Sequence, residues 1–349
     1  MNDTINTALI GFGMSGQYFH APFLDANPGF KLTKVLERRS DKSKQLYPYI
    51  QIVRDLSDLL KDKEIDLIII NTPNYLHFQM AKQALLAGKH VVVEKPFTVA
   101  SSEAAELINI ASRQKKILSV FQNRRWDGDF LTAKNIIEDK LLGKLVEFES
   151  HFDRFRNFIK PNTWKEDSLP GNGMLYDIGS HLIDQAVCLF GKPDSLFADL
   201  RIHRPGGKII DNFELILNYG NLKVILRSNF LSKIPLPRFT LHGTEGSFIK
   251  HGLDPQEDTL KLTGYKDTDD WGREPEGLWG MIDTAFNGMN IKKKIETIPG
   301  CYQKYFQNLY EVIIESKELA VKPEDALITT RLIETAIESS NKKRVVDFI

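Results

Sequence analysis

The feature that most constrains the fold is a glycine turn between an apolar run and a helical stretch. The apolar run is Thr7-Ala8-Leu9-Ile10, and the turn that follows it is Gly11-Phe12-Gly13-Met14-Ser15-Gly16. Gly11 permits a tight turn, Gly13 lets the backbone approach a pyrophosphate, and Gly16 lets the helix pack on the strand. An ordinary tight turn is the alternative, but the position at the start of an alternating region favours a dinucleotide-binding turn.

Strand and helix patterns alternate after this turn. Each β-branched or apolar run of three to six residues is followed by a helical stretch, which predicts a parallel sheet with right-handed crossovers. The further strands are expected near Lys31–Leu36, Ile65–Ile70, Val91–Val93 and Ile117–Phe121. We therefore predict an α/β chain whose first domain, residues 1–122, is a doubly wound Rossmann fold that binds NAD(P).

The remainder, residues 123–349, has a different pattern. Short alternating segments joined by turns such as Asn218-Tyr219-Gly220-Asn221 predict an open, mainly antiparallel sheet. Helices are expected near Phe130–Leu141, Tyr302–Leu319 and Glu324–Ser340, and a long surface loop over Asp254–Gly280. This second domain is predicted to be α+β and to serve in substrate binding and oligomerisation.

Charge and cysteine usage exclude several classes of function. Lysine plus arginine equals aspartate plus glutamate at 46 each, so no net charge attracts nucleic acid or an anionic membrane. Cys188 and Cys301 are the two cysteines, which argues against a disulfide framework or a thiolate zinc site and fits a reducing compartment. We expect no metal. The start of the sequence lacks the pattern of a signal peptide, so a cytoplasmic location is expected.

The end of the second predicted strand bears on the choice between NADP and NAD. An acidic residue there holds a free ribose 2′-hydroxyl, whereas arginine and serine accommodate a 2′-phosphate. Glu37 is followed by Arg38, Arg39 and Ser40, so both chemistries are present. Two arginines and a serine outweigh one glutamate, which favours NADP over NAD. A solvated charged loop is the alternative.

Two further strand ends carry polar residues. Thr72, Pro73 and Asn74 follow the third apolar strand, where the ligand crevice of such a sheet lies, so we expect them to line the cofactor. His77 either joins them or is an ordinary helix residue. The next strand ends in Glu94-Lys95-Pro96. A lysine at this edge loses hydration unless a polar or anionic group compensates, so Lys95 is predicted to be functional rather than a surface lysine paired with a glutamate.

A second chemical cluster lies in the second domain. Glycines flank Asp177, and an apolar helical run follows it with His181 four residues later. On one helical face, a carboxylate and an imidazole can bind and deprotonate a hydroxyl. A capping aspartate and a core histidine are the alternative. A metal pair is not favoured, because no cluster of histidine or cysteine supplies further ligands.

Four motifs in this order resemble the glucose-fructose oxidoreductase/inositol dehydrogenase (Gfo/Idh/MocA) family. They are Gly11-x-Gly13-x-x-Gly16, Thr72-Pro73-Asn74-x-x-His77, Glu94-Lys95-Pro96 and the glycine-flanked Asp177-x-x-x-His181. Within that family, the segments at 123–127, 173–177 and 246–250 resemble the branch of NADP-dependent scyllo-inositol dehydrogenases. One departure is Asn172, which stands where many members have another glycine.

The resemblance implies hydride transfer between NADP, or NAD, and a secondary hydroxyl or ketone of a cyclic polyol or sugar. It implies that Lys95 is the acid–base residue, His181 its partner and Asp177 the group that orients the hydroxyl. Glu94 and Pro96 would fix Lys95 and the cofactor, with a cis peptide before Pro96. Residues implied to line the pocket are Asn123, which also contacts the cofactor, Arg124, Arg154 and Trp164.

The family also implies a homo-oligomer, a dimer or tetramer, paired through the open sheet. A non-catalytic dinucleotide sensor of the same fold is the main alternative, although a sensor has no need of Lys95 and His181 together. A second alternative keeps the fold and changes the substrate to a trans-dihydrodiol or an anhydro-sugar ketone.

Overall fold

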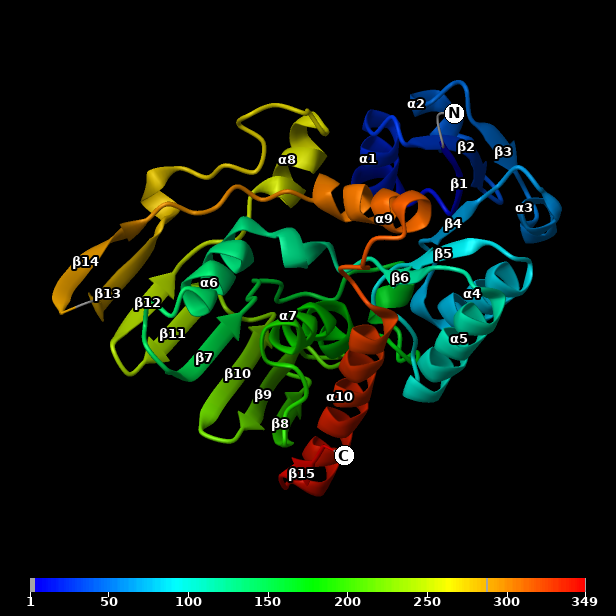
Figure 1. Ribbon diagram of the computed structural model, residues 1–349. Helices are drawn as coiled ribbons and strands as arrows, with labels where there is room; N and C mark the ends of the chain where they lie inside the picture. The colour runs from blue at the N-terminus through cyan, green and yellow to red at the C-terminus, as the bar shows by residue number, and fades with distance from the viewer. Residues whose placement is uncertain (1–3, 287, 349) are drawn as a thin grey trace. The chain divides into compact units, whose positions relative to one another are not determined.

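The computed structural model describes residues 4–286 and 288–348. The chain forms two compact units (Figure 1). The first comprises residues up to 123 together with 256–269 and 302–327, and the second comprises 124–255, 270–301 and the residues from 328 onward. Each unit is described by itself.

The first unit contains a six-stranded parallel sheet with strand order β3-β2-β1-β4-β5-β6. This is the predicted Rossmann sheet. The strands are β1 (Ile5–Ile10), β2 (Phe30–Leu36), β3 (Gln51–Val53), β4 (Leu67–Ile70), β5 (His90–Val93) and β6 (Leu118–Val120). Strands β4 and β5 are buried along nearly their whole length, which explains their continuous apolar sequences. The short edge strand β3 was not predicted, because three residues of mixed exposure carry no periodic pattern.

Helices connect these strands. They are α1 (Ala21–Ala26), preceded by a π-helical turn at Gly16–His20, α2 (Lys42–Leu46), α3 (Leu56–Lys61), α4 (His77–Leu86) and α5 (Ser101–Gln114). Local signals set their ends: the Asp55 side chain accepts the Ser57 amide at the start of α3, and Gly88, at a φ of +77°, follows α4.

The first unit also takes in two segments that the division at residue 122 had assigned to the second domain. These segments contain helix α8 (Gln256–Thr263) and helix α9 (Gln303–Glu315), which lies beside α1 (Figure 1). The cause is aromatic packing: the ring of Phe306 stacks on Phe23 at 5.6 Å and lies 5.7 Å from Phe121. Contacts of this kind between residues far apart in sequence leave no periodic signal.

The second unit contains a nine-stranded sheet with strand order β14-β13-β12-β11-β7-β10-β9-β8-β15. The strands are β7 (Leu145–His151), β8 (Ser195–Arg201), β9 (Asn212–Tyr219), β10 (Leu222–Asn229), β11 (Phe239–Gly243), β12 (Gly246–Lys250), β13 (Gly280–Phe286), β14 (Met289–Ile295) and β15 (Val346–Asp347). All pairs are antiparallel except β7 with β10. This confirms a mainly antiparallel sheet.

Strands β13 and β14 and helix α8 were not predicted. The loop expected over residues 254–280 contains α8 and a 3₁₀ turn at Glu276–Leu278. Strand β14 is exposed or half-exposed throughout, so it lacks the apolar alternation that identifies a strand. The hairpin pairs in the structure because β13 continues the ladder of β12.

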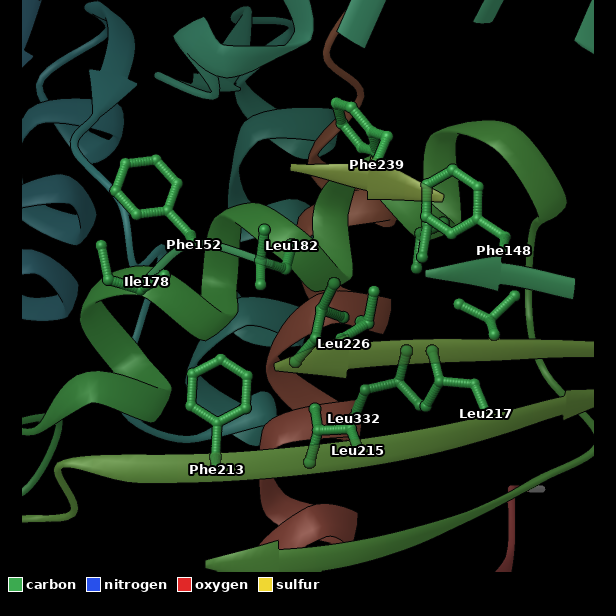
Figure 2. Close-up of a cluster of buried hydrophobic side chains, with 14 of the residues drawn as sticks. Phe148, Phe152, Ile178, Leu182, Phe213, Leu215, Leu217, Leu226, Phe239 and Leu332 are labelled. Atoms are coloured by element: carbon green, nitrogen blue, oxygen red, sulfur yellow. The ribbon is translucent and has the colours of Figure 1, made fainter. Parts of the chain in front are cut away.

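The core of the second unit lies on one face of this sheet. Helices α6 (Gly128–Glu138), α7 (Ser180–Phe190) and α10 (Pro323–Lys342) contribute Phe130, Leu182 and Leu332 to it. Figure 2 shows these helical leucines facing Leu215 of β9 and Leu226 of β10. The inward residues of β9 and β10 alternate with less buried ones, as expected of a sheet with one covered face. In the described ranges 4–286 and 288–348, no helix has both the length and the apolar character needed to cross a membrane.

Candidate active site

The glycine turn follows β1 directly, and close contacts leave no room for a side chain at Gly11 or Gly16. Gly11 has a φ of +93°, and a Cβ there would lie 2.8 Å from Asn71 Oδ1. A Cβ on Gly16 would lie 2.9 Å from the Gly11 carbonyl oxygen and 3.0 Å from Asn71 Nδ2. The turn is therefore packed against the end of β4, and Asn71 is the side chain that fills the contact.

Two features at this turn fit a bound dinucleotide. The Cα of Gly13 faces open space, because a Cβ there would have no atom within 4 Å. The amide group of Asn71 and the hydroxyl of Thr72 are buried and have no hydrogen-bond partner among the described residues. Buried polar groups are normally satisfied, so a ligand that supplies partners is expected here. Asn71 was not among the predicted site residues, and its position one residue before Thr72 was the available signal.

At the end of β2, Glu37 is buried whereas the two arginines that follow it are exposed. Glu37 is buried, and its carboxylate accepts hydrogen bonds from the Ser40 hydroxyl at 2.5 Å and from the amide and hydroxyl of Ser43 at 2.9 Å and 2.6 Å. Arg38 and Arg39 are exposed. Both oxygens of Glu37 are thus used within the protein, at the start of α2.

The end of β4 contains Thr72, Pro73 and Asn74, followed by His77 at the start of α4. Thr72, Pro73 and Asn74 are half-buried. His77 is fully buried, with Nδ1 2.9 Å from the Pro96 carbonyl oxygen and Nε2 2.9 Å from the Thr72 carbonyl oxygen. Burial lowers the pKa of His77 against the opposing effect of these carbonyl contacts. A contact of His77 with the cofactor stays a prediction, while its observed contacts join the ends of β4 and β5.

The end of β5 carries Glu94-Lys95-Pro96, and the Lys95–Pro96 peptide is cis as expected. Glu94 Oε1 lies 2.9 Å from His20 Nε2 and accepts the Ser15 hydroxyl, while Oε2 accepts the Lys95 amide at 3.1 Å. Burial alone would raise the pKa of Glu94, but the hydrogen bonds from His20 and Ser15 and the charge of Lys95 lower it. Glu94 therefore connects the glycine turn to the backbone of Lys95.

In the second unit, Asp177 and His181 lie on one continuous helical segment. A π-helical turn at Leu175–Gly179 leads into α7, and π turns often occur at functional sites. Asp177 is half-buried and His181 is buried, at 4% exposure. Gly173, at a φ of +99°, approaches the backbone of Ile210 closely, and its carbonyl accepts the Asp177 amide at 2.9 Å. The glycine before Asp177 is thus needed for the entry into the helix.

Buried ion pairs and hydrogen bonds hold α7 one turn after His181. Asp184 receives two hydrogen bonds from Arg125, each 2.7 Å long, and the Gln185 amide donates to the Arg124 carbonyl at 2.8 Å. Arg238, also buried, donates to Asp129 at 3.2 Å and to Gln185 at 2.8 Å. These contacts fix the segment after residue 123 against the helix that carries His181.

The predicted pocket residues of the second unit are only partly accessible. Arg124 is buried, forms an ion pair with Asp127 at 3.1 Å and stacks over Phe152, which Arg154 also covers. Asn172 donates to the carbonyls of Trp164 and Asp167 at 2.6 Å and 3.0 Å. Asn172 therefore supports the loop that carries Trp164. No group of three or more His, Cys, Asp or Glu in the described part of the chain is arranged to hold a metal ion.

Known families match both units. The model described as "Oxidoreductase family, NAD-binding Rossmann fold" matches residues 5–122, and that described as "Oxidoreductase family, C-terminal alpha/beta domain" matches residues 134–348. The chain belongs to the Gfo/Idh/MocA oxidoreductase family. Residues 5–122, in the first unit, are an NAD(P)-binding Rossmann domain.

Individual members of the Gfo/Idh/MocA family are similar over nearly their whole length. The uncharacterized oxidoreductase YdgJ of Escherichia coli is 40% identical over 98% of each chain. The scyllo-inositol 2-dehydrogenase (NADP(+)) IolW of Bacillus subtilis is 37% identical over 99% of this chain and 96% of its own. A crystal structure of a putative oxidoreductase from Bacteroides fragilis has 45% identity and a TM-score of 0.91, covering 99% of this chain and 100% of that one.

Hydrogen bonds within the first unit connect several residues of the Gfo/Idh/MocA motifs. Ser15 and the backbone of Lys95 meet at Glu94, and His77 contacts the backbone on both sides, at Thr72 and Pro96. Asp177 and His181 belong to the second unit. Their action together with Lys95 stays a prediction. His20 was not predicted, because nothing in its neighbourhood shows that its partner lies 74 residues away.

Proposed function

We propose that this protein is an NADP-dependent dehydrogenase that transfers hydride at a secondary hydroxyl or ketone of a cyclic polyol or sugar of the inositol type. The observation that carries this proposal is the position of Lys95. It follows β5 at the sheet edge that also presents the glycine turn, and its backbone is bonded to the same carboxylate as Ser15. That position favours a base beside the reacting carbon.

In the proposed reaction, the residues of this chain have the following roles. When bound, the nicotinamide ring accepts or donates the hydride. Lys95 accepts the hydroxyl proton on Nζ during oxidation and returns it during reduction. His181 and Asp177 bind the hydroxyl and orient its proton toward Lys95. Holding the reacting groups in this orientation lowers the entropic part of the activation barrier. Asn123, Arg124, Arg154 and Trp164 are proposed to line the pocket.

The preference for NADP is supported by the arrangement after β2. A carboxylate that holds a ribose 2′-hydroxyl needs free oxygens, and those of Glu37 are engaged by Ser40 and Ser43. The guanidinium of Arg54 donates to the carbonyls of Glu37 and Ser40 at 2.6 Å and 2.7 Å, which fixes the loop. The exposed Arg38 and Arg39 are then available to a 2′-phosphate.

A titration followed by a substrate panel tests this function. NADPH and NADH are titrated by fluorescence, and the oxidised form of the tighter cofactor is then offered with scyllo-inositol, myo-inositol and a set of pyranoses. Tight NADPH binding with turnover of an inositol is expected. In an Arg38→Ala, Arg39→Ala variant, NADPH should bind about tenfold to a hundredfold more weakly while NADH binding is nearly unchanged. Equal losses for both cofactors would contradict the assignment of the arginines.

The panel also separates an enzyme from a dinucleotide sensor. A sensor would bind NADPH and turn over no polyol or ketone. The presence of both Lys95 and His181 favours the enzyme, because binding alone needs no group that moves a proton.

We also propose that the protein is a homo-oligomer that pairs through the open face of the nine-stranded sheet. Apolar side chains on this face form two groups, each on neighbouring strands, and are half-buried or exposed. One group consists of Phe197, Ile216 and Ile225 on β8, β9 and β10, and the other of Ile249 and Met281 on β12 and β13. Glu149 of β7 and Thr240 of β11 lie in register between the two groups. Apolar groups that are partly exposed on one face of a sheet favour an interface between copies of one chain. Sedimentation of the wild-type protein as a monomer would contradict this proposal, and Ile225→Lys should dissociate the oligomer.

A further inference from the structure

A fully buried histidine holds the carboxylate that precedes Lys95. His20 has 0% exposure, and its Nε2 lies 2.9 Å from Glu94 Oε1. The hydroxyl of Ser15 donates to the same oxygen, and the amide of Lys95 donates to Oε2 at 3.1 Å. One side chain thus contacts the cofactor turn, the acid–base segment and the helix that follows the turn. All of these residues lie within the first unit.

The surroundings of His20 decide which ring nitrogen carries the hydrogen. The ring packs on Phe121 at 4.3 Å and against the edge of Phe306 at 6.1 Å. Its Nδ1 has no hydrogen-bond partner among the described residues, so a hydrogen there would be buried without an acceptor. The hydrogen therefore lies on Nε2, which donates it to Glu94.

The local backbone is built to aim this ring inward. The helix after the glycine turn contains a π-helical turn at Gly16–His20, closed by a hydrogen bond from the Ala21 amide to the Gly16 carbonyl. A π turn inserts one extra residue and thereby changes the direction of the side chains that follow it. This π turn begins directly after Ser15, which contacts Glu94 from the glycine turn, and ends at His20, which contacts Glu94 from the helix.

Three donors to the carboxylate of Glu94 fix the orientation of this side chain. An ionised carboxylate only accepts, and its lowered pKa keeps Glu94 ionised at neutral pH. Its donors are His20, Ser15 and the Lys95 amide. Because the Ser15 hydrogen is committed to Glu94, the side chain of Ser15 cannot donate to a phosphate. Ser15 then serves to fix the turn, and phosphate contacts come from backbone amides.

We infer that His20 is a positioning residue for the reaction. Through Glu94 it fixes the position of the Lys95 backbone relative to the glycine turn. This inference rests on the proposed function. Loss of the His20 donor leaves a buried carboxylate with fewer hydrogen bonds, so Glu94 turns away and both attached segments shift. A core histidine that only fills space would have no such effect.

Three variants separate the two roles. His20→Gln places an amide nitrogen near the position of Nε2 and keeps the donor. The side chain of His20→Asn is one methylene shorter than that of His20→Gln, so its amide donor is withdrawn from Glu94. His20→Phe keeps an aromatic ring without a donor. Tyr305→Phe is the matched control, because it removes a hydroxyl that contacts Ser119 at 3.1 Å beside the same aromatic cluster and leaves the donors to Glu94 in place. Each variant is measured for its NADPH dissociation constant, for kcat and KM on the substrate found in the panel, and for its urea unfolding midpoint.

His20→Phe and His20→Asn are expected to weaken NADPH binding and to lower kcat by about tenfold to a hundredfold each, as misplaced groups do. His20→Gln should stay within about threefold of wild type in both measurements. Tyr305→Phe should change only the unfolding midpoint. The effect of His20→Phe should also disappear in a Glu94→Gln background, because the two residues act through one contact.

The inference is overturned if His20→Phe and His20→Asn keep NADPH binding and kcat within about twofold while losing stability as Tyr305→Phe does. If His20→Phe does not fold, the comparison of Asn with Gln decides in the same way. Failure of the proposed function would look different, because wild type itself would then turn over no substrate. In that case the NADPH titrations still decide the role of His20, and a wild type that binds neither cofactor refutes the inference together with the function.

Discussion

Arg125 and Asp184 form a two-point ion pair in the interior of the second unit, with Nε to Oδ2 and Nη2 to Oδ1 each at 2.7 Å. Both side chains are almost completely buried. A buried pair of this kind fixes geometry more than it adds net stability, because desolvation offsets most of its attraction. It joins the segment after residue 123 to the helix that carries His181 three residues earlier.

Removal of one partner should therefore be costly. Asp184→Leu removes both hydrogen bonds that the buried Arg125 guanidinium donates to this carboxylate, so the free energy of unfolding should fall by about 3–5 kcal/mol in urea denaturation. The double variant Arg125→Met, Asp184→Leu should recover most of this loss. Glu338→Gln, which breaks an exposed pair with Lys342, is the control and should leave stability nearly unchanged. A double variant as unstable as the single one would contradict this account.

Substitutions of Gly13 and Gly16 in the turn should have different effects on stability and cofactor binding. Gly16→Ala drives a methyl group into the Gly11 carbonyl and Asn71, so stability should fall by about 1–3 kcal/mol together with cofactor binding. Gly13→Ala places its methyl group in open space and should fold normally, yet bind NADPH at least about tenfold more weakly. Gly277→Ala, also in open space, is the control for both measurements. Unchanged NADPH binding by Gly13→Ala would show that the pyrophosphate lies elsewhere.

Lys95 should be needed for turnover and not for folding. Lys95→Met should lower kcat by about a hundredfold or more, since general acid–base groups contribute on this scale, while the unfolding midpoint stays the same. His181→Ala should lower kcat by a similar factor. The exposed Lys63→Met serves as the control for loss of a lysine charge in the same unit. Near-normal turnover in both Lys95→Met and His181→Ala would exclude the proposed mechanism.

His90 should make the protein less stable in mild acid. Burial, assisted by the charge of Lys116, lowers its pKa from 6.5 to about 4. In addition, Nδ1 accepts the Ile117 amide at 3.0 Å, which a protonated Nδ1 cannot do. Between pH 6.5 and about 4, His90 is protonated in the unfolded chain and neutral in the folded chain. The contribution of His90 to the free energy of unfolding is therefore complete above pH 6.5 and is lost as the pH falls toward 4.

His90→Asn retains an acceptor near Nδ1 and does not titrate. Relative to this variant, wild type should lose about 1–2 kcal/mol between pH 7 and pH 4.5, allowing for the partial exposure of the ring. Urea unfolding of both proteins at the two pH values gives the difference, in which all other titrating groups cancel. Parallel losses in the two proteins would mean that His90 is protonated without penalty in the folded state.

The sequence predicted the elements whose signals are local. Strands β1, β4 and β5 are apolar runs of the right length, and the glycines after β1 are a local signal for a turn into a helix. The parallel sheet followed from the alternation of strands with helices. Lys95, Asp177 and His181 were also predicted to be functional from their sequence context, and the resemblance added their individual roles.

Other features depend on partners far away in the chain and have no local signal. The sequence contains both Glu37 and Arg38, and only the structure shows that the glutamate turns inward to Ser40 and Ser43. The edge hairpin of β13 and β14 also escaped prediction, because its pairing is determined by the ladder of β12 and not by its own side chains.

The sequence by itself thus determined the alternation of strands and helices in the first unit, the glycine turn and the identity of the residues at the strand ends. Backbone propensity, side-chain periodicity and glycine geometry are properties of short segments, which is why they can be read directly. Only the tertiary structure decided that His20 bonds to Glu94, that Asn71 fills the glycine turn and that α9 packs on α1. Those contacts depend on which distant segments pack together, and this is decided by the burial of the whole core.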